Sequence, residues 1–519
     1  MQLLLFSGSL LADTDGFLIT DINGRNGFTI DHGFHLDGVR PAVTNTTSFI
    51  GDINNDGLDD VLLSNISSAQ QDDQSGSVAV VFGRAGLYPS TIEIDDLDGS
   101  NGFLIIGAEF TRLGVFVSAA GDINNDGIDD VVMSTLGGGV SYLLFGRDSG
   151  FPAQFSINDL TPSQGIRVSA HNSATGNSGT PTSAHYAGDV NDDGIDDVIF
   201  GVPEDITNEV SGAYVVFGGS NLPPAINLFE LNGQDGFAME ASLVGNTPVG
   251  SSVSKAGDIN HDGIDDVMVS SVLGTAGNEV FNGAAFVVFG RSTAFPARMD
   301  LSMLNGSDGF LIVGSGTFGG FGHALSAMGD LNQDGIDDFA VGAYRFEGDQ
   351  AQSGRAYVFF GSDDGFAPSM NAQSLNGSNG FILSSNEFLA NFGSGIASEI
   401  DFNRDGINDI VIGAPGSVAR RGMRGRVYVV YGQAEAYPER IDVDTLSADA
   451  GVVIIGNEND RLGVSVDQAG DLNQDGFADL LISANGGVDG VLRTVEVKHH
   501  VVFNNATEVV FANSFEVNP

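Results

Sequence analysis

Short apolar runs alternate with polar, glycine-rich segments along the whole chain. Runs such as 130–134 and 409–413 hold five residues, are rich in valine and isoleucine, and end at a serine or a glycine. Runs of this length and composition are typical of buried β-strands and are too short for helices. The sequence therefore predicts an all-β protein.

The same order of strands recurs, and the region around residue 260 shows one full repeat. Four apolar runs fall at 250–257, 266–270, 283–290 and 304–313. Consecutive short strands of this kind pair as an antiparallel meander, and several meanders around one axis form a β-propeller.

A polar nine-residue motif, Asp-x-Asn-x-Asp-Gly-x-x-Asp, separates the first strand of each repeat from the second. Its seven copies begin at Asp52, Asp122, Asp189, Asp258, Asp330, Asp401 and Asp471. Successive copies start 67 to 72 residues apart, and such a regular period is the signature of a repeat architecture. We therefore predict a seven-bladed β-propeller with four-stranded antiparallel blades, in which the motif connects the first two strands of each blade.

The offset between two repeated signatures predicts how the ring closes. A second signature, asparagine or aspartate followed by Gly-Phe, starts the fourth strand of most repeats, and its copy at 26–28 precedes the first polar motif. No copy follows the last polar motif, so we expect residues 27–30 to pair into the last blade and remove its free edge. The third strand of that blade is either 3–6 or 497–503, and the sequence leaves both open.

These repeats predict one propeller over residues 1–503. The blades are expected at approximately 43–106, 112–170, 183–242, 249–314, 320–385, 391–456 and 461–503, the last closed by 1–31. Residues 504–519 fall outside the repeat and are expected to form a tail or an extra edge strand. Segment 171–183, rich in serine, threonine, glycine and asparagine, is typical of a surface loop.

The polar motif has the composition of a loop that binds a hard cation. Positions 1, 3, 5 and 9 carry side-chain oxygens, glycine at position 6 permits a sharp turn, and the carbonyl at position 7 supplies a further oxygen. Calcium accepts about six to eight oxygen ligands in flexible geometry. Position 12 is apolar in every copy, which excludes EF-hands because these need a glutamate there. We predict about seven Ca²⁺ ions; the alternative is a set of metal-free Asx turns.

The predicted ligands follow from the motif positions, with position 7 acting through its carbonyl. They are Asp52, Asn54, Asp56, Leu58, Asp60, Asp122, Asn124, Asp126, Ile128, Asp130, Asp189, Asn191, Asp193, Ile195, Asp197, Asp258, Asn260, Asp262, Ile264, Asp266, Asp330, Asn332, Asp334, Ile336, Asp338, Asp401, Asn403, Asp405, Ile407, Asp409, Asp471, Asn473, Asp475, Phe477 and Asp479.

Composition indicates the compartment and excludes one class of partner. The formal net charge is −48, from 68 acidic and 20 basic residues, and cysteine is absent. So acidic a surface argues against nucleic acid, whose phosphates need a basic partner, and the predicted calcium is abundant outside the cell. No apolar run is long enough to span a bilayer, and the apolar start at 1–12 lacks the basic residues of a signal peptide. We expect a secreted or cell-surface monomer.

Taken together, the repeats resemble the FG-GAP repeat. The pattern Leu-Gly-x-x-Val-x-x-x-Gly-Asp leads into the polar motif, and Gly413-Ala414-Pro415 and Gly201-Val202-Pro203 follow it. FG-GAP repeats build the seven-bladed N-terminal propeller of integrin α chains and occur in many bacterial surface proteins, so the chain looks like a bacterial integrin-α-like surface or secreted protein. The resemblance covers about 450 to 480 residues and implies calcium in the loops and a ligand-binding or adhesive role.

Ligand contacts are expected on the rim opposite the polar motifs. The connections between second and third strands lie on that rim, and their length varies from short at 136–140 to long at 271–281 and 342–353. Repeat scaffolds keep structural loops constant and vary the loops that bind. The alternative is that these connections are neutral surface loops.

A basic cluster lies on one of these connections. It consists of Arg420, Arg421, Arg424 and Arg426. Arginine binds carboxylates and anionic sugars through paired hydrogen bonds, so these residues are the candidate ligand-binding residues. The alternative is a solvated loop that balances an acidic molecule.

No motif for a serine nucleophile, a zinc site or a phosphate loop occurs in the sequence. His499 and His500 are adjacent, so on a strand their side chains point to opposite faces. The sequence thus predicts a non-catalytic, calcium-stabilised adhesion or ligand-binding propeller whose partner is a protein or a glycan. One alternative is a polysaccharide lyase or glycosidase with acid and base groups at the channel mouth; another is a structural spacer in a surface assembly.

Overall fold

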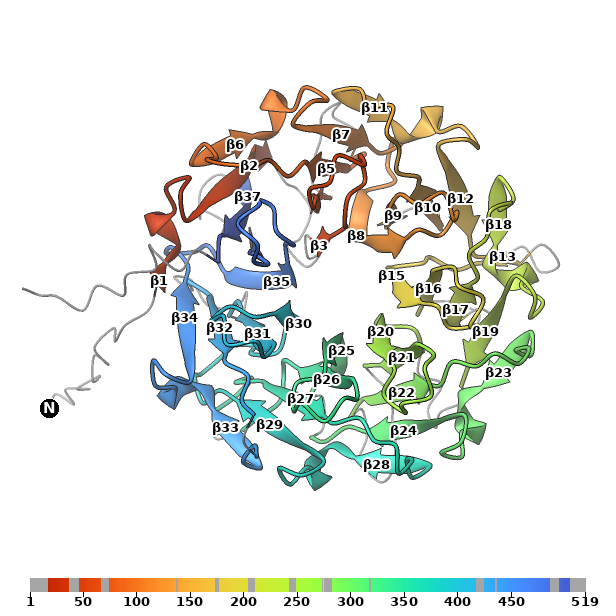
Figure 1. Cartoon of the computed structure of the whole chain (residues 1–519), viewed down its shortest axis with the longest axis vertical. Helices are drawn as coiled ribbons and strands as arrows, with labels where there is room; N and C mark the ends of the chain where they lie inside the picture. Colours follow the sequence, from red (N-terminus) through yellow and green to blue (C-terminus); the bar gives the residue numbers. More distant parts are fainter. Residues whose placement is uncertain are drawn as a thin grey trace, which may run out of the picture.

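Seven five-stranded β-sheets stand around a common axis, and each sheet is one blade of a propeller (Figure 1). The computed structural model describes residues 17–36, 46–66, 74–136, 139–172, 177–203, 211–241, 249–272, 274, 282–316, 319–348, 350–416, 424–434, 436–485 and 494–504. Helices in these residues are confined to three-residue 3-10 turns, none of which is long and apolar enough to cross a membrane. The predicted seven-bladed β-propeller is confirmed.

Blade 2 shows the arrangement that all blades share. From the axis outward its strands are β8 (Leu113–Gly121), β9 (Asp130–Thr135), β10 (Val140–Leu144), β12 (Gly165–Ser169) and β18 (Ala225–Asn227). Strands β8, β9, β10 and β12 pair as an antiparallel meander, and the outermost strand, β18, pairs in parallel with β12. The polar motif connects β8 to β9.

The other blades follow the same order from the axis outward. Blade 1 contains β3 (Thr47–Phe49), β4 (Val61–Asn65), β5 (Ser77–Val81), β7 (Gly102–Ile106) and β11 (Gln154–Ser156). Blade 3 contains β15 (Ser183–Gly188), β16 (Asp197–Val202), β17 (Gly212–Val216), β19 (Gly236–Glu240) and β23 (Arg298–Asp300). Blade 4 contains β20 (Val253–Gly257), β21 (Asp266–Ser271), β22 (Ala284–Val288), β24 (Gly309–Val313) and β28 (Ser369–Asn371). Blade 5 contains β25 (Phe321–Gly329), β26 (Asp338–Ala343), β27 (Arg355–Phe359), β29 (Gly380–Ser384) and β33 (Arg440–Asp442). Blade 6 contains β30 (Ile396–Ile400), β31 (Asp409–Ala414), β32 (Arg426–Val430), β34 (Gly451–Ile455) and β1 (Phe17–Leu18). Blade 7 contains β35 (Leu462–Gln468), β36 (Leu480–Asn485), β37 (Thr494–Val502), β2 (Gly27–Leu36) and β6 (Thr91–Glu93).

The fifth strand of each blade differs from the four-stranded prediction. It is formed by the chain on its way from the third to the fourth strand of the next blade: β23 lies in the sequence between β22 and β24 of blade 4, yet it pairs in parallel with β19 and so belongs to the sheet of blade 3. A 3-10 turn follows each one: η1 (Ile19–Asp21), η2 (Ile94–Asp96), η3 (Ile157–Asp159), η4 (Leu228–Glu230), η5 (Leu301–Met303), η6 (Ala372–Ser374) and η7 (Val443–Thr445). Each blade is thereby bound to the next by backbone hydrogen bonds.

Segment 171–183, predicted as a surface loop, carries a small hairpin of β13 (His171–Asn172) and β14 (Asn177–Ser178). The side chain of Asn227 on β18 fixes this hairpin, because its Nδ2 donates to the carbonyl of His171 at 2.9 Å and its Oδ1 accepts from the N–H of His171 at 3.3 Å. The hairpin therefore belongs to the outer edge of blade 2.

Strands near the two ends of the described residues close the ring. In blade 7, β2 pairs antiparallel with β37, placing Gly27 opposite Val502 and Ile30 opposite His499. The predicted pairing of 27–30 is therefore confirmed, and the third strand of that blade comes from the C-terminal candidate at 497–503, whereas 3–6 lies outside the described residues. In addition, β1 forms the outer strand of blade 6 by pairing with β34.

The hydrophobic core lies between neighbouring blades. Seven clusters of buried apolar side chains occupy the described blade boundaries. The Gly-Phe signature supplies the central ring of most of them: Phe310 is fully buried and stacks on Phe366 of the next blade, with 4.4 Å between ring centroids. Phe103 stacks in the same way on Phe151 at 4.1 Å. Offset-stacked aromatic pairs add to the stabilisation that burial alone gives.

Candidate metal loops and central channel

The seven polar loops share one hydrogen-bonded geometry. In blade 2, Oδ1 of Asp122 accepts from the N–H of Asp126 at 2.9 Å, and its Oδ2 accepts from the N–H of Gly127 at 2.8 Å. Gly127 has a φ of +88°, a conformation that side-chain-bearing residues rarely adopt. Asn125 at position 4 also has a positive φ, of 57°, and residues at this position in all seven loops do the same. The first aspartate thus folds each loop around itself.

The aspartate at position 9 is the fully buried carboxylate of each loop. All seven of these side chains are fully buried: Asp60, Asp130, Asp197, Asp266, Asp338, Asp409 and Asp479. Asp130 accepts from the N–H of Gly146 at 2.8 Å through Oδ1, which ties the loop to the end of β10. Its Oδ2 has no hydrogen-bond partner in the part of the chain that the structure describes. Burial raises the pKa of Asp130 to about 8, since a buried carboxylate without a cation resists ionisation.

The donor set fits a hard cation. Carboxylate, amide and carbonyl oxygens are the ligands that calcium takes. In blade 2 the buried Oδ2 of Asp130 is an acceptor left without a donor, whereas in five other loops the same atom accepts the N–H of the residue at position 2, as Asp60 does from Ile53. Within the described residues, however, no three acidic or imidazole side chains converge as a metal-binding group on their own, so positions 3 and 7 would have to complete each site. The same loop bonds also describe an Asx turn, as where Asn54 accepts from Asp56 at 2.9 Å. Calcium therefore stays a prediction.

Replacing Asp126 with alanine is expected to remove about one of seven calcium equivalents and leave the other sites nearly unchanged. Each loop lies within one blade, and contacts in repeat proteins are mostly between neighbours. Isothermal titration with calcium measures the number of sites, and Asp95→Ala, a change in the 3-10 turn η2, serves as the matched control. Loss of all binding in the Asp126 variant would show one cooperative unit instead of seven sites.

Position 8 of the motif connects neighbouring blades, a role that the sequence did not reveal. Oδ2 of Asp129 in blade 2 accepts from the N–H of Asp52 in blade 1 at 2.9 Å. The equivalent bonds join Asp196 to Asp122, Asp265 to Asp189, Asp337 to Asp258, and Asp59 to Asp471, at 2.7–3.0 Å. The recurrence of aspartate at a position that is not a ligand was the available signal.

The boundary between blades 6 and 7 uses different contacts. Ala478 occupies position 8 in blade 7 and offers no acceptor. Arg404 of blade 6 instead bonds the carbonyl of Asn504, and its guanidinium lies 3.4 Å from the ring centroid of Phe477. Asn504 also donates to the carbonyl of Asp401 at 2.9 Å. An arginine and the C-terminal end of the described chain thus replace the aspartate at this boundary.

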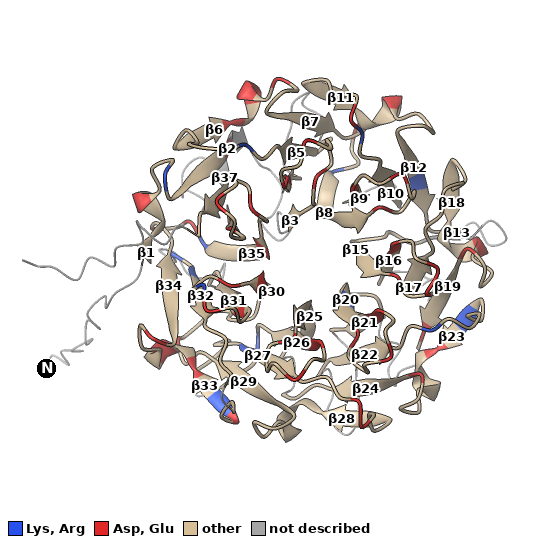
Figure 2. Cartoon of the chain, viewed as in Figure 1, with Lys and Arg blue, Asp and Glu red and all other residues tan. Residues whose placement is uncertain are grey.

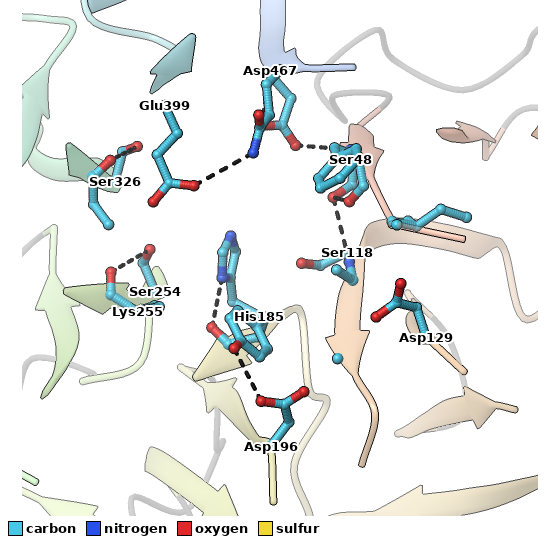
Figure 3. Close-up of a pocket in the computed structure, with 18 of the residues that line it drawn as sticks. Ser48, Ser118, Asp129, His185, Asp196, Ser254, Lys255, Ser326, Glu399 and Asp467 are labelled. Carbon is cyan, nitrogen blue, oxygen red and sulfur yellow. Dashed lines mark hydrogen bonds between the residues drawn. The ribbon is translucent and has the colours of Figure 1, made fainter. Parts of the chain in front are cut away.

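The innermost strands surround an axial channel with a cavity of about 370 Å³ (Figure 3). Its wall carries hydroxyl groups, including those of Ser48, Ser118 and Ser254. These residues lie four positions before the polar motif, where blade 7 has Asp467. Acidic residues gather on the loops around the axis, and basic residues are few (Figure 2). The channel is therefore polar and acidic.

Five carboxylates line this channel beside one lysine, Lys255: those of Asp59, Asp129, Asp196, Glu399 and Asp467. Glu399 accepts from Nε2 of Gln468 at 3.4 Å, and Lys255 forms an ion pair with Asp265 at 3.0 Å. Asp467 lines the channel, and its side chain is partly exposed to the channel while protein atoms surround it on its other sides. Burial first, with a smaller contribution from Glu399, raises the pKa of Asp467 to about 7.

Replacing Asp467 with asparagine is expected to flatten the dependence of stability on pH. Because the pKa of Asp467 is raised to about 7 in the folded state, its contribution to stability is complete below its usual pKa and is lost as pH rises through about 7. Between about pH 5 and pH 8 the wild type should lose a few degrees of melting temperature relative to the variant. Melting curves at several pH values, with the exposed Asp98→Asn as control, measure this. Parallel curves for wild type and variant would contradict the assignment.

The predicted basic cluster is only partly described. Arg420 and Arg421 lie outside the described residues. Arg426 begins β32 and forms an ion pair with Glu387, so its charge is already compensated. The long connections at 271–281 and 342–353 also fall partly outside the described residues, and the ligand-binding role of the cluster stays a prediction.

The adjacent histidines have separate partners. Nδ1 of His499 lies 2.8 Å from Oγ of Ser483, whereas Nδ1 of His500 lies 3.0 Å from Oγ1 of Thr29. Both rings are buried, and they bond different neighbours, which agrees with opposite faces of β37. They hold the last blade together.

Comparison with known proteins agrees with this architecture. A model of the FG-GAP repeat matches residues 321–359 and 392–430, which run from first to third strand in blades 5 and 6. The chain is 32% identical over 271 residues to integrin alpha pat-2 of Caenorhabditis elegans, covering 50% of this chain and 20% of that protein. It is 33% identical over 171 residues to integrin alpha-5 of Xenopus laevis, covering 32% and 15%.

A relative of another kind is phosphatidylinositol-glycan-specific phospholipase D of Rattus norvegicus, 28% identical over 209 residues, or 40% of this chain and 23% of that protein. The chain thus spans less than a quarter of the length of each of these relatives. The fold and the repeated loops define a closed β-propeller of the repeat-protein class. More particularly, the chain is an integrin-α-like β-propeller that contains FG-GAP repeats. Its bacterial origin stays a prediction.

Proposed function

We propose that this chain is a calcium-stabilised extracellular propeller that binds a protein or glycan ligand without catalysing a reaction. The observation that carries the proposal is its similarity to integrin alpha chains over half of its length. A ligand-binding adhesion domain is the function that this similarity favours. The constant hydrogen-bonded geometry of the polar loops supports a structural role for them, which leaves binding to another surface.

The proposed binding surface is the rim opposite the polar loops. In blade 2 this rim carries the connection from β9 to β10 and the start of β8. The corresponding connections in other blades differ in length, while the polar loops do not. Binding loops vary on a constant scaffold, so this rim is the better candidate.

The test is an array of glycans and extracellular matrix proteins probed with the calcium-loaded chain. A triple variant, Arg420→Ala with Arg421→Ala and Arg424→Ala, should weaken binding to anionic ligands without lowering the melting temperature. Arg440→Ala, on β33 at the outer edge of blade 5, removes a charge outside the cluster and serves as the control. Absence of binding to every protein and glycan on the array would contradict the proposed function and favour a structural spacer.

An enzyme is the second candidate, because of the similarity to phosphatidylinositol-glycan-specific phospholipase D. That match covers 40% of this chain and 23% of that protein, so it extends over less than a quarter of the relative. Incubating the chain with a glycosylphosphatidylinositol-anchored protein and with acidic polysaccharides tests for turnover. Calcium-dependent product release from either substrate would replace the binding function with a catalytic one.

A further inference from the structure

One blade carries a charged residue where every other blade carries an uncharged one. At the pair of residues that face each other across the third and fourth strands, blade 2 has Tyr142 and Arg167. The equivalent pairs are Ala79 and Leu104, Tyr214 and Ala238, Phe286 and Leu311, Tyr357 and Ile382, Tyr428 and Val453, and His500 and Thr29. Arg167 is exposed, whereas Leu104, Ala238 and Ile382 are buried. Blade 2 therefore departs from the repeat at one specific place.

Arg167 and Tyr142 line a pocket of about 420 Å³ on the outer part of blade 2. Thr135 at the end of β9 and Val140 at the start of β10 also line it, so the pocket lies towards the rim opposite the polar loops. A pocket of this size is within the range of small-molecule sites.

Three polar side chains of this pocket, those of Arg167, Tyr142 and Asn158, have no protein partner among the described residues, whereas the hydroxyl of Thr135 donates to the carbonyl of Val140 at 2.7 Å. Within the described residues Arg167 forms no hydrogen bond or ion pair, although acidic residues outnumber basic ones 68 to 20. The hydroxyl of Tyr142 has no hydrogen-bond partner there either, in contrast to Tyr357, whose hydroxyl lies 2.9 Å from Oγ of Ser315. Asn158 on η3 uses its backbone N–H for Ser156, and its side-chain amide is likewise unengaged among the described residues.

We propose that this pocket binds an acidic sugar residue, with Arg167 holding its carboxylate. A guanidinium forms two parallel hydrogen bonds to a planar carboxylate. The amide of Asn158 and the hydroxyl of Tyr142 each donate and accept, as sugar hydroxyls require. Leu160 and Pro224 give the pocket an apolar wall against which the C–H face of a pyranose ring packs.

An acidic peptide side chain fits the pocket less well. Its carboxylate would bond Arg167 but leave Asn158 and Tyr142 without partners, and an unpaired polar group in a filled pocket costs free energy. The inference rests on the proposed ligand-binding function and names the ligand class of one site on the binding rim.

The test uses ligand-observed NMR on the calcium-loaded full chain with three probes: D-glucuronate, D-glucose and L-glutamate. Glucuronate should give saturation-transfer signals, and the two other probes should be much weaker. Arg167→Leu should weaken glucuronate binding about tenfold or more, the loss expected for a charge-assisted hydrogen bond. This variant should fold, because Leu104 and Leu311 occupy the same position in blades 1 and 4.

Two further variants sharpen the result. Tyr142→Phe copies Phe286 of blade 4 and should reduce affinity by a smaller factor, while Arg440→Leu removes an arginine from the outer edge of another blade and should change nothing. Equal binding of glutamate, or glucuronate binding that survives Arg167→Leu, would overturn the sugar assignment. If glucuronate fails to bind, or still binds to Arg167→Leu, while array ligands bind, the proposed function stands and this inference fails. If glucuronate binds through Arg167 while no array ligand binds, the pocket is right and the adhesive function is wrong.

Discussion

Chelation of calcium is expected to lower the melting temperature by tens of degrees or to unfold the chain. The aspartates at position 9 are fully buried in all seven loops, and without a metal the aspartates at positions 5 and 1 repel the buried one, as Asp126 and Asp122 do to Asp130. If free calcium is about tenfold above the dissociation constant, each site stabilises the fold by roughly 1.4 kcal/mol. Seven sites then contribute on the order of 10 kcal/mol, comparable with the stability of a whole domain.

The measurement is thermal melting in excess chelator, followed by restoring calcium or magnesium. Calcium should restore the original curve, and magnesium should restore little, because it demands stricter octahedral geometry and keeps its waters. A melting curve that does not change in chelator would contradict a structural role for calcium. It would favour Asx turns held by their own hydrogen bonds, such as that between Asp122 and Gly127.

Replacing Phe310 with alanine should cost about 3–5 kcal/mol of unfolding free energy. The ring is fully buried at the boundary between blades 4 and 5, stacks on Phe366 at 4.4 Å and contacts Phe289 at 6.0 Å between centroids. Removing the ring leaves a cavity between the two blades that the neighbouring rings of Phe289 and Phe366 do not fill. Urea unfolding with calcium present measures the loss, and the exposed Met303→Ala serves as the control. A loss no larger than that of the control would show that the stacked rings do not hold the two blades together.

The number of blades and the ring closure could be predicted because they depend on recurrence. Seven motifs at a regular spacing fix seven units, and the early copy of the Gly-Phe signature indicates a strand that has to pair elsewhere. The fifth strand could not be predicted in this way. In β23 only Met299 is buried between the exposed Arg298 and Asp300, and three residues are too few for a period to be recognised.

The candidate sites likewise differ in how far the sequence alone predicts them. Ligand positions in the polar loops follow from composition, whereas the bond from Asp129 to Asp52 depends on which blades are neighbours. The pocket of blade 2 is hidden for another reason. Its fourth strand begins Gly165-Ile166 instead of Gly-Phe, and Pro223 stands where the preceding blade has Phe151, five residues after the glycine that ends the third strand. Both members of the usual aromatic pair are absent there, and this joint change is visible only when blades are superposed.

Closure of the ring by strands near the two ends of the described residues fixes an order of events during synthesis. Among the described strands of the ring, only β1 precedes β2 in the sequence and none follows its partner β37, and Thr29 and His500 are separated by 471 residues. The entropy of closing so long a loop rises only slowly with its length, but contacts between distant residues form slowly. Until residues 494–502 emerge, the side chain of Phe28, fully buried in the finished protein, has no last blade to enter. The blades made earlier must therefore remain soluble with one sheet edge unpaired. The ring closes only when β37 has been made and pairs with β2.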